Sequence, residues 1–282
     1  VMSDYVFAIA IAQIKTQKIR KLFVVLSVVV NLGVLGYYKY TNFFIENINH
    51  FIKNDIKIAT IVLPIGISFF TFQAMSYVID VYRGDVAAQK NPFYVMLYVS
   101  LFPQLIAGPI VRYTDIEREL QERKHSVTLA ASGIKRFLIG LSNKVLIANV
   151  LGELTDICLK TSQPSILSWW MYAAALVLQI YFDFSGYSDM AIGLGRIFGF
   201  QFPENFNYPL ISRSVKEFWR RWHISLGRWF KTYIFYPVSM SKLTRKWNRF
   251  AKKHTSKYIK LMVASAIALF PVWVCNGLWH GA

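Results

Sequence analysis

Two histidines have the type and position that suit proton transfer in this chain. His280 stands at the end of the apolar run 258–281, and His223 lies within the aromatic and basic segment 215–231. An imidazole has an ordinary pKa of about 6.5, so it can accept a proton from a hydroxyl and later release it. Acyl transfer to an alcohol needs a base of this kind. An ionisable group at the end of a membrane-length apolar run is costly unless it is paired or faces water, which makes His280 a candidate catalytic residue.

Both histidines also have a purely structural interpretation. A straight helix rises about 1.5 Å per residue, so a helix starting near Lys260 would bring His280 to the opposite membrane surface as an interfacial residue. His223 could pack beside aromatic rings and bond to the backbone. Asn276 lies four residues before His280, on the same helical face, where it could steady the imidazole or an oxyanion.

Four further charged residues are candidates for structural ion pairs. Asp183 and Asp189 lie inside an apolar run, where carboxylates need partners. The arginines of segment 215–231 are the expected partners. Asp80 and Arg83 are spaced three residues apart, so we expect a local pair between them.

Segment 215–231 is strongly amphipathic when it is drawn as a single helix. Its tryptophans and phenylalanines fall on one side and its cations on the other. We therefore predict one helix that lies in the membrane interface or fills a cavity. We assign substrate binding to residues near the two histidines, namely Arg220, Arg221, Trp222, Asn276 and Trp279.

The composition indicates a membrane protein. The 282 residues are 55% hydrophobic and 16% aromatic, yet the chain carries a formal net charge of +17. Because the cations flank apolar runs, they indicate membrane topology and lipid contact, and we expect no nucleic-acid partner. Two cysteines, Cys158 and Cys275, are too few for a disulfide framework or a metal site, and we predict no metal. Residues 242–260 hold cations and no acid, and we expect them to face the cytoplasm, where they could meet anionic lipid or the phosphates of coenzyme A.

The apolar runs predict an all-α membrane bundle. Prolines and glycines inside residues 58–82 and 93–111 predict broken helices that line a cavity. Residues 166–200 exceed the length of one span and should bend near Ser185 and Gly186. We expect residues 112–125 to form an exposed cytoplasmic loop and 134–151 a short mixed helix. The remaining expected spans, or parts of spans, are residues 5–14, 22–38 and 258–281. Because residue 1 is Val and an apolar run reaches the last residues, we expect residues 1–282 to be one domain that is incomplete at both ends.

Several motifs resemble those of the membrane-bound O-acyltransferase superfamily, in particular its bacterial alginate O-acetyltransferase-like branch. They are PIGISFFTFQ (64–73), DVYRG (80–84), FPQLIAGPI (102–110), DFSGYSD (183–189), PENFN (203–207), EFWRRWHISL (217–226) and GLWHG (277–281). Their shared order and spacing make the resemblance specific. It covers roughly residues 64–282.

The resemblance implies a multi-helix bundle around a tunnel, with re-entrant or in-plane amphipathic helices, in the bacterial cytoplasmic (inner) membrane. It implies that His280 is the catalytic residue inside the tunnel and that His223 assists from a nearby helix. The expected reaction moves an acyl group, acetyl in this branch, from a cytoplasmic thioester to a hydroxyl of a cell-envelope polysaccharide or its carrier. Acetyl-CoA would be the co-substrate, no cofactor would be bound, and an extracytoplasmic acyltransferase could be a partner.

Two alternatives stay open at this point. A sister branch transfers D-alanine to teichoic acid from a carrier protein. A transporter or channel could use a buried histidine as a proton relay, although the charges concentrate on one amphipathic segment instead of several spans. The chain reads Lys231-Thr232-Tyr233 where alginate-type proteins tend to read Arg-Asp-Tyr, which argues against alginate as the acceptor.

Overall fold

Helices and connecting loops make up the described part of the chain. The computed structural model describes residues 1–52, 61–105, 108–161 and 165–281, and no strand occurs among them. Four helical stretches are long and apolar enough to cross a membrane: α2 (Gln17–Ile52), the stretch Val127–Lys160, α9 (Ile166–Ile197) and α14 (Lys257–His280). The all-helical prediction is confirmed.

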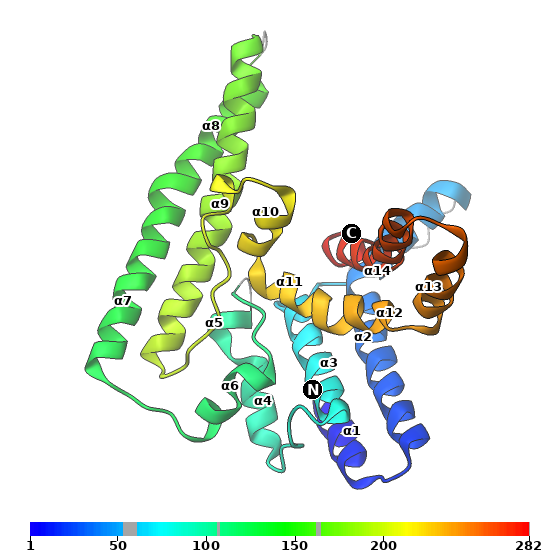
Figure 1. Cartoon of the computed structure of the whole chain (residues 1–282). Coiled ribbons are helices and arrows are strands. Elements are labelled where there is room, and N and C mark those ends of the chain that lie inside the picture. Colours follow the sequence, from blue (N-terminus) through cyan, green and yellow to red (C-terminus); the bar gives the residue numbers. More distant parts are fainter. Residues whose placement is uncertain (53–60, 106–107, 162–164, 282) are drawn as a thin grey trace.

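The stretch Val127–Lys160 forms a long antiparallel hairpin with α9, seen in green on one side of the molecule (Figure 1). It consists of α7 (Val127–Ser142), a π-helical segment (Asn143–Ala148) and α8 (Asn149–Lys160). The prediction of a short mixed helix at residues 134–151 is therefore wrong. Mixed composition hid the continuity of this stretch, in which Arg136 and Lys144 pair with carboxylates of α9.

Two pairs of glycines let the hairpin close tightly. A methyl group on Gly140 would lie 2.5 Å from the carbonyl oxygen of Gly186, and one on Gly193 would lie 2.6 Å from the carbonyl oxygen of Gly133. The glycines on each helix are seven residues apart, about two turns, so both contacts fall on one face. α9 runs through Ser185 and Gly186 as one continuous helix, and Gly186 serves close packing. The expected bend there stays a prediction.

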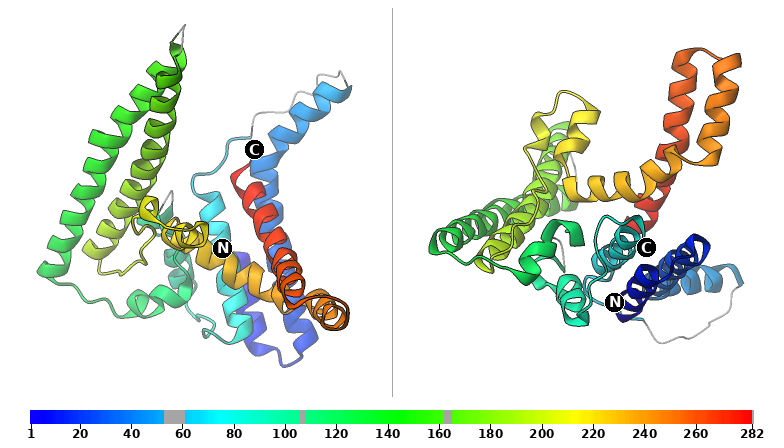
Figure 2. Two further views of the ribbon diagram at one scale, coloured as in Figure 1. Left: turned by 45° about the horizontal axis from the view of Figure 1, so that its top comes forward. Right: turned by 60° about the horizontal axis from the view of Figure 1, so that its bottom comes forward.

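A second group of helices lies on the other side of the molecule (Figures 1 and 2). It contains α1 (Met2–Gln13), α2, α3 (Ile67–Arg83) and α14. Buried Asp4 of α1 accepts hydrogen bonds from Ser27 and Asn31 of α2, at 2.7 and 2.6 Å. This polar contact fixes the register between α1 and α2.

The two stretches that contain proline are broken, as predicted. α3 begins only at Ile67, after Gly66 in the left-handed region with φ of 77°. The fourth apolar run divides into α4 (Pro92–Ser100) and α5 (Phe102–Leu105), separated by extended Leu101. Residues 58–60 and 106–107 of these two runs lie outside the described residues.

The expected exposed loop at residues 112–125 is largely a packed helix, α6 (Tyr113–Gln121). Its residues Tyr113, Ile116 and Leu120 are buried in the core. The Tyr113 ring contacts those of Tyr77 in α3 and Tyr98 in α4, with centroids 4.8 and 5.3 Å apart. The spacing of three and four residues between the buried side chains is helical, and it was obscured by the many charges around them.

Segment 215–231 is not the single helix that its pattern predicts. It forms α10 (Val215–Arg221) and α11 (Ile224–Phe230), which are separated at Trp222 and His223. A π-helical turn (Lys231–Phe235) and α12 (Tyr236–Ser239) follow. Together these pieces lead from the green hairpin to the second group of helices (Figure 1).

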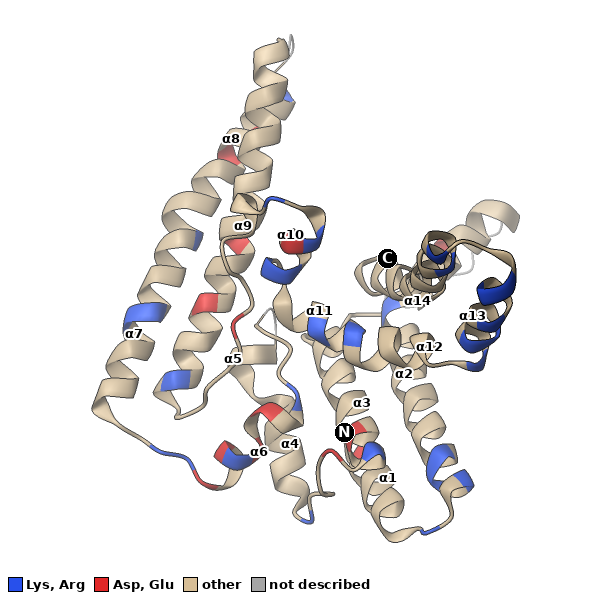
Figure 3. Cartoon of the chain, in the orientation of Figure 1, with Lys and Arg blue, Asp and Glu red and all other residues tan. Residues whose placement is uncertain are grey.

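Most of the basic residues of the C-terminal region lie on α13 (Lys242–His254), which packs beside α14 (Figure 3). The indole of Trp247 donates to the carbonyl oxygen of Lys260 at 3.1 Å and ties the two helices together. Thr244 and Ala251 are buried on the same side. Outward from this contact lie Lys242, Arg245, Lys246, Arg249, Lys252 and Lys253, all exposed.

Candidate functional site

The first candidate residue, His223, stands at the break between α10 and α11. Its backbone has φ of 43°, a left-handed conformation that side-chain-bearing residues rarely adopt. The side chain is 4% exposed. The Phe184 ring of α9 meets the imidazole edge to face at 4.7 Å between centroids, and the Phe206 ring stacks with it at 6.4 Å.

Asn205 supplies the cap that α11 lacks in its own sequence. His223 is the N-cap residue of α11 and makes no side-chain cap bond. The backbone carbonyl of Asn205 accepts from Ile224 N at 2.9 Å, and its Oδ1 accepts from Ser225 N at 3.2 Å. Two of the free amides at this helix start are thereby satisfied by a loop far away in the sequence.

The same amide oxygen holds the imidazole. Nδ1 of His223 lies 3.0 Å from Oδ1 of Asn205, and the Ser225 hydroxyl donates to that oxygen at 2.8 Å. Ser225 in turn accepts from the backbone N–H of Ile110 at 2.9 Å. The site therefore joins the loop 203–207, the start of α11 and the segment after α5.

Burial and the neighbouring His280 lower the pKa of His223 to about 3. A ring with so low a pKa is neutral at physiological pH. His223 lies at the junction between α10 and α11, outside the four candidate spanning helices.

The second candidate residue, His280, ends α14. Its side chain is exposed, whereas the neighbouring Trp279 is only 9% exposed. The two rings meet edge to face at 4.5 Å. Lys39 and Tyr40 of α2 donate to the carbonyl oxygens of Trp279 and Leu278, which would otherwise be free at the helix end. The His280 ring is thus presented on a fixed helix end and is not enclosed by packing.

Trp279 links α14 to α3 and α11. Its ring lies 5.5 Å from that of Phe72, which stacks on Trp229 at 4.0 Å. The indole nitrogens of Trp279 and Trp229 donate to backbone oxygens of α3, at Ser68 and Phe72. Trp279, assigned to substrate binding from the sequence, has a packing role here that positions the helix end bearing His280.

The other residues assigned to substrate binding have different surroundings. Arg221 donates to the carboxylate of Glu217 at 3.0 Å and to the carbonyl oxygen of Asn207 at 3.0 Å. Trp222 packs between the rings of Phe206 and Phe218, at 5.1 and 5.7 Å.

Arg220 and Asn276 complete that set. Arg220 is exposed and Asn276 half-buried. Within the described residues, no hydrogen bond joins Asn276 to His280, so the expected contact between them is not formed in this structure.

The expected ion-pair partners of Asp183 and Asp189 are wrong. Asp189 pairs with Arg136 of α7 at 2.7 Å, and Asp183 pairs with Lys144 of the π-helical segment. Arg136 also holds Glu204. These cations come from the neighbouring side of the hairpin and not from segment 215–231, because α7 and the π-helical segment pack against α9.

Asp80 and Arg83 are not paired with each other. The hydroxyl of Tyr233 lies 2.8 Å from both carboxylate oxygens of Asp80. Arg83 donates to the carbonyl oxygen of Thr232 at 3.2 Å and lies over the Tyr233 ring. Both residues therefore fasten α3 to the π-helical turn after α11, a contact that local spacing in the sequence does not reveal.

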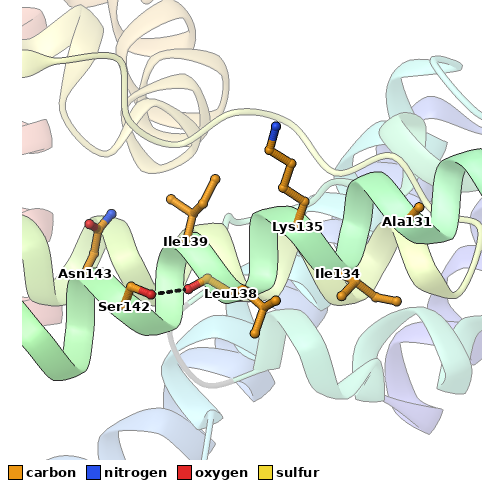
Figure 4. A pocket seen from close by; sticks show the side chains of 7 residues that line it. All are labelled: Ala131, Ile134, Lys135, Leu138, Ile139, Ser142 and Asn143. Atoms are coloured by element: carbon orange, nitrogen blue, oxygen red, sulfur yellow. Dashed lines mark hydrogen bonds between the residues drawn. The ribbon is translucent and has the colours of Figure 1, made fainter.

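One surface hollow lies away from both histidines. It has a volume of about 560 Å³ and is lined by Ala131, Ile134, Lys135, Leu138, Ile139, Ser142 and Asn143 (Figure 4). All seven come from α7 and the first residue of the π-helical segment, and the hollow is mainly apolar. It contains no histidine and no carboxylate.

Sequence reasoning missed Asn205, Ser225, Arg136 and Glu204 as parts of the site. The PENFN stretch that holds Glu204 and Asn205 was identified as a motif, but no role followed from it. Among the described residues, no group of three or more His, Cys, Asp or Glu side chains could hold a metal ion. The tunnel that the resemblance implies stays a prediction.

The chain matches a family model and several characterised proteins. Residues 88–252 match the model of "MBOAT, membrane-bound O-acyltransferase family", a segment that includes Asn205 and His223. The protein named "Probable alginate O-acetylase AlgI" from Pseudomonas aeruginosa is 43% identical over 278 residues, 97% of this chain and 50% of the relative.

Two further relatives carry other names. The "Peptidoglycan O-acetyltransferase" of Helicobacter pylori is 33% identical over 310 residues, covering 100% of this chain and 56% of the relative. The "Teichoic acid D-alanyltransferase" of Bacillus subtilis is 31% identical over 222 residues, 77% and 53% of the two chains. The chain spans about half the length of these relatives. With four apolar helices long enough to cross a membrane and this family match, it is a membrane protein that belongs to the membrane-bound O-acyltransferase family.

Proposed function

We propose that the whole protein is an O-acyltransferase that moves an acetyl group from a cytoplasmic thioester to a hydroxyl of a cell-envelope polysaccharide or of its carrier. The observation that carries this proposal is the placement of the two histidines. His280 is exposed on a fixed helix end, and His223 is buried at the break between α10 and α11. Trp279, next to His280, and Trp229 of α11 both stack on Phe72, which ties the two elements together. Relatives named for O-acetyl transfer support the choice of chemistry.

In the proposed reaction, His280 accepts the proton of the acceptor hydroxyl while the hydroxyl oxygen attacks the thioester carbonyl. A C–O bond forms, the C–S bond breaks, and the leaving thiolate takes the proton back from the imidazolium of His280. His223 assists from the neighbouring junction. Arg220, Arg221, Trp222, Asn276 and Trp279 are proposed to line the substrate path.

The donor is proposed to be acetyl-CoA, with no cofactor bound. Residues 242–260 would face the cytoplasm, where their cations could meet the phosphates of coenzyme A or anionic lipid. The protein would cross the bacterial inner membrane several times, residues 1–282 forming one membrane-embedded domain. An extracytoplasmic acyltransferase would be its partner on the outer side.

A second candidate function is D-alanyl transfer to teichoic acid, favoured by the relative named for it, at 31% identity. Membranes containing the full-length protein can be supplied with labelled acetyl-CoA or with D-alanyl carrier protein. The proposal expects label on envelope polysaccharide from acetyl-CoA only. Transfer from the carrier protein alone would reject acetyl in favour of D-alanine.

Comparing His280→Ala with His125→Ala tests the role of the first histidine. His125 is exposed in the loop between α6 and α7, outside the residues proposed to bind donor or acceptor, and provides a matched histidine control. The proposal expects acetyl transfer to be lost in the first variant and kept in the second. Equal activity in both variants would reject His280 as the base.

A further inference from the structure

The imidazole of His223 has one nitrogen that is bonded and one that is not. Nδ1 contacts Oδ1 of Asn205 at 3.0 Å. Nε2 is buried and has no hydrogen-bond partner among the described residues. Because buried polar atoms are nearly always bonded, the free nitrogen indicates a position where another group binds.

The hydrogen-bond network fixes which nitrogen carries the proton. The backbone N–H of Ser225 can only donate, so the atom of Asn205 that it meets at 3.2 Å is the amide oxygen. The hydroxyl oxygen of Ser225 accepts from Ile110 N. The hydroxyl proton is therefore available to donate to the amide oxygen of Asn205, at 2.8 Å. That oxygen can only accept, so Nδ1 of His223 must donate to it, and Nε2 carries the lone pair.

The loop that carries Asn205 is anchored on both sides. Glu204, one residue before, is held by Arg136 of α7 and lies 3.9 Å from Arg196 of α9. Asn207, two residues after, donates its backbone N–H to the carbonyl oxygen of Arg221 at 2.9 Å. The amide oxygen is therefore positioned by the hairpin and by α10, independently of the histidine.

We propose that Asn205 is a positioning residue that holds His223 in the Nδ1–H tautomer, so that Nε2 accepts a hydrogen bond from a hydroxyl of the acyl acceptor. The ligand class is an alcohol, such as a sugar hydroxyl, which supplies the O–H donor that a lone pair requires. This inference rests on the proposed function for the identity of the ligand. The tautomer itself follows from the hydrogen bonds alone.

The low pKa of His223 agrees with this arrangement. A ring that stays neutral keeps the Nε2 lone pair available throughout the working pH range, whereas an imidazolium would have none. His223 in this state binds and orients the hydroxyl that His280 is proposed to deprotonate.

The tautomer can be measured without any activity assay. Nitrogen-15 spectra of the full-length protein, labelled at histidine and held in lipid nanodiscs, distinguish protonated from unprotonated ring nitrogens. His223→Gln assigns the signal by its loss. We expect a protonated Nδ1 and an unprotonated Nε2 that do not change between pH 8 and about pH 5. A protonated Nε2 at neutral pH would overturn the proposal.

Two asparagines of one loop provide a matched pair of variants. Asn205→Ala removes the amide oxygen that accepts from Nδ1 of His223. Signals of both tautomers should then appear in the spectrum. Asn207→Ala should leave the signal unchanged, because that side chain is exposed. An unchanged signal in Asn205→Ala would reject the positioning role.

Kinetics then test the hydroxyl. Asn205→Ala should lower kcat/KM for the acceptor about tenfold, the worth of one ordinary hydrogen bond, and leave KM for the thioester unchanged. Asn205→Asp keeps the acceptor atom and adds a negative charge, so it should keep the tautomer and move the acidic limb of the pH profile upward. If kcat/KM for both substrates falls in proportion to the amount of folded protein, Asn205 has a purely structural role and the proposal is overturned. If the wild-type protein shows the Nδ1–H tautomer of His223 but transfers no acyl group, the positioning by Asn205 is supported and the proposed function is rejected.

Discussion

The Nδ1 atom of His223 lies 3.0 Å from the Oδ1 atom of Asn205, 18 residues earlier in the chain. The same oxygen caps the start of α11, so one amide serves both the helix and the histidine. Two amides at the start of α11 are thereby bonded where the chain breaks at His223 in the left-handed conformation. The candidate site is built at that break and not on the face of a helix.

The burial of His223 makes the stability of the fold depend on pH. The imidazole takes up a proton near pH 6.5 in the unfolded chain but only near pH 3 in the fold, so the unfolded state binds more protons between these values. The stability that the neutral imidazole of His223 contributes is fully present above about pH 6.5 and is lost as the pH falls toward 3. Unfolding titrations at several pH values should show this decline in the wild type and a shallower one in His223→Gln. Equal slopes in the two proteins would contradict the assigned burial.

Arg136 holds two carboxylates at once, Asp189 of α9 and Glu204 beside Asn205. Its hydrogen bond lowers the pKa of Glu204, so the contact stabilises the fold above the ordinary value of about 4.5 and is lost as pH falls below it. Arg136→Gln should reduce thermal stability at pH 7 and weaken acetyl transfer, because the loop of Asn205 loses its anchor. Lys135→Gln, next to it and exposed, is the control. Identical melting of the two variants would show that the network contributes little.

The glycine contacts of the α7 and α9 hairpin predict a sharp difference between two alanine substitutions. Gly140→Ala places a methyl group 2.5 Å from a backbone oxygen, which cannot move without separating the helices. We expect a loss of about 1–3 kcal/mol in unfolding free energy, typical of overpacking. Gly33→Ala has nothing within 4 Å and should be neutral or slightly stabilising. Comparable stability of both variants in detergent would contradict the close packing.

The length and apolar content of the spanning helices could be predicted from the sequence because bilayer thickness sets them. The apolar runs at residues 22–38, 166–200 and 258–281 correspond to α2, α9 and α14. Prolines at positions 64 and 103 indicated broken helices because a proline removes a backbone donor. The two histidines were found because ionisable residues are rare in such surroundings.

The contacts between distant segments could not be predicted in this way. The amphipathic pattern of segment 215–231 is continuous through His223, and only the cap from Asn205 explains the break. The partners of Asp183 and Asp189 depend on which helix packs against α9. One signal was present but unused: Gly133 and Gly140, like Gly186 and Gly193, are spaced by seven residues, which indicates a close helix contact.

The cations of α13 offer a test of which anion they meet. Changing Lys242, Lys246 and Lys253 to Gln should reduce the stabilisation by anionic lipid in nanodiscs, by about 1 kcal/mol for each lysine near the surface. The same positions changed to Arg keep the charge and should keep the effect. If the cations serve coenzyme A instead, KM for acetyl-CoA rises in the Gln variant while lipid dependence stays as in the wild type. A Gln variant that matches the wild type in both measurements would contradict both roles.

The proposed reaction depends on His280 accepting the proton of the acceptor hydroxyl. We would measure acetyl transfer from labelled acetyl-CoA to envelope polysaccharide in membranes containing full-length His280→Ala, with protein amount matched to the wild type. We predict that transfer falls to background, while His125→Ala keeps wild-type turnover. Wild-type turnover in His280→Ala would show that His280 is not the base.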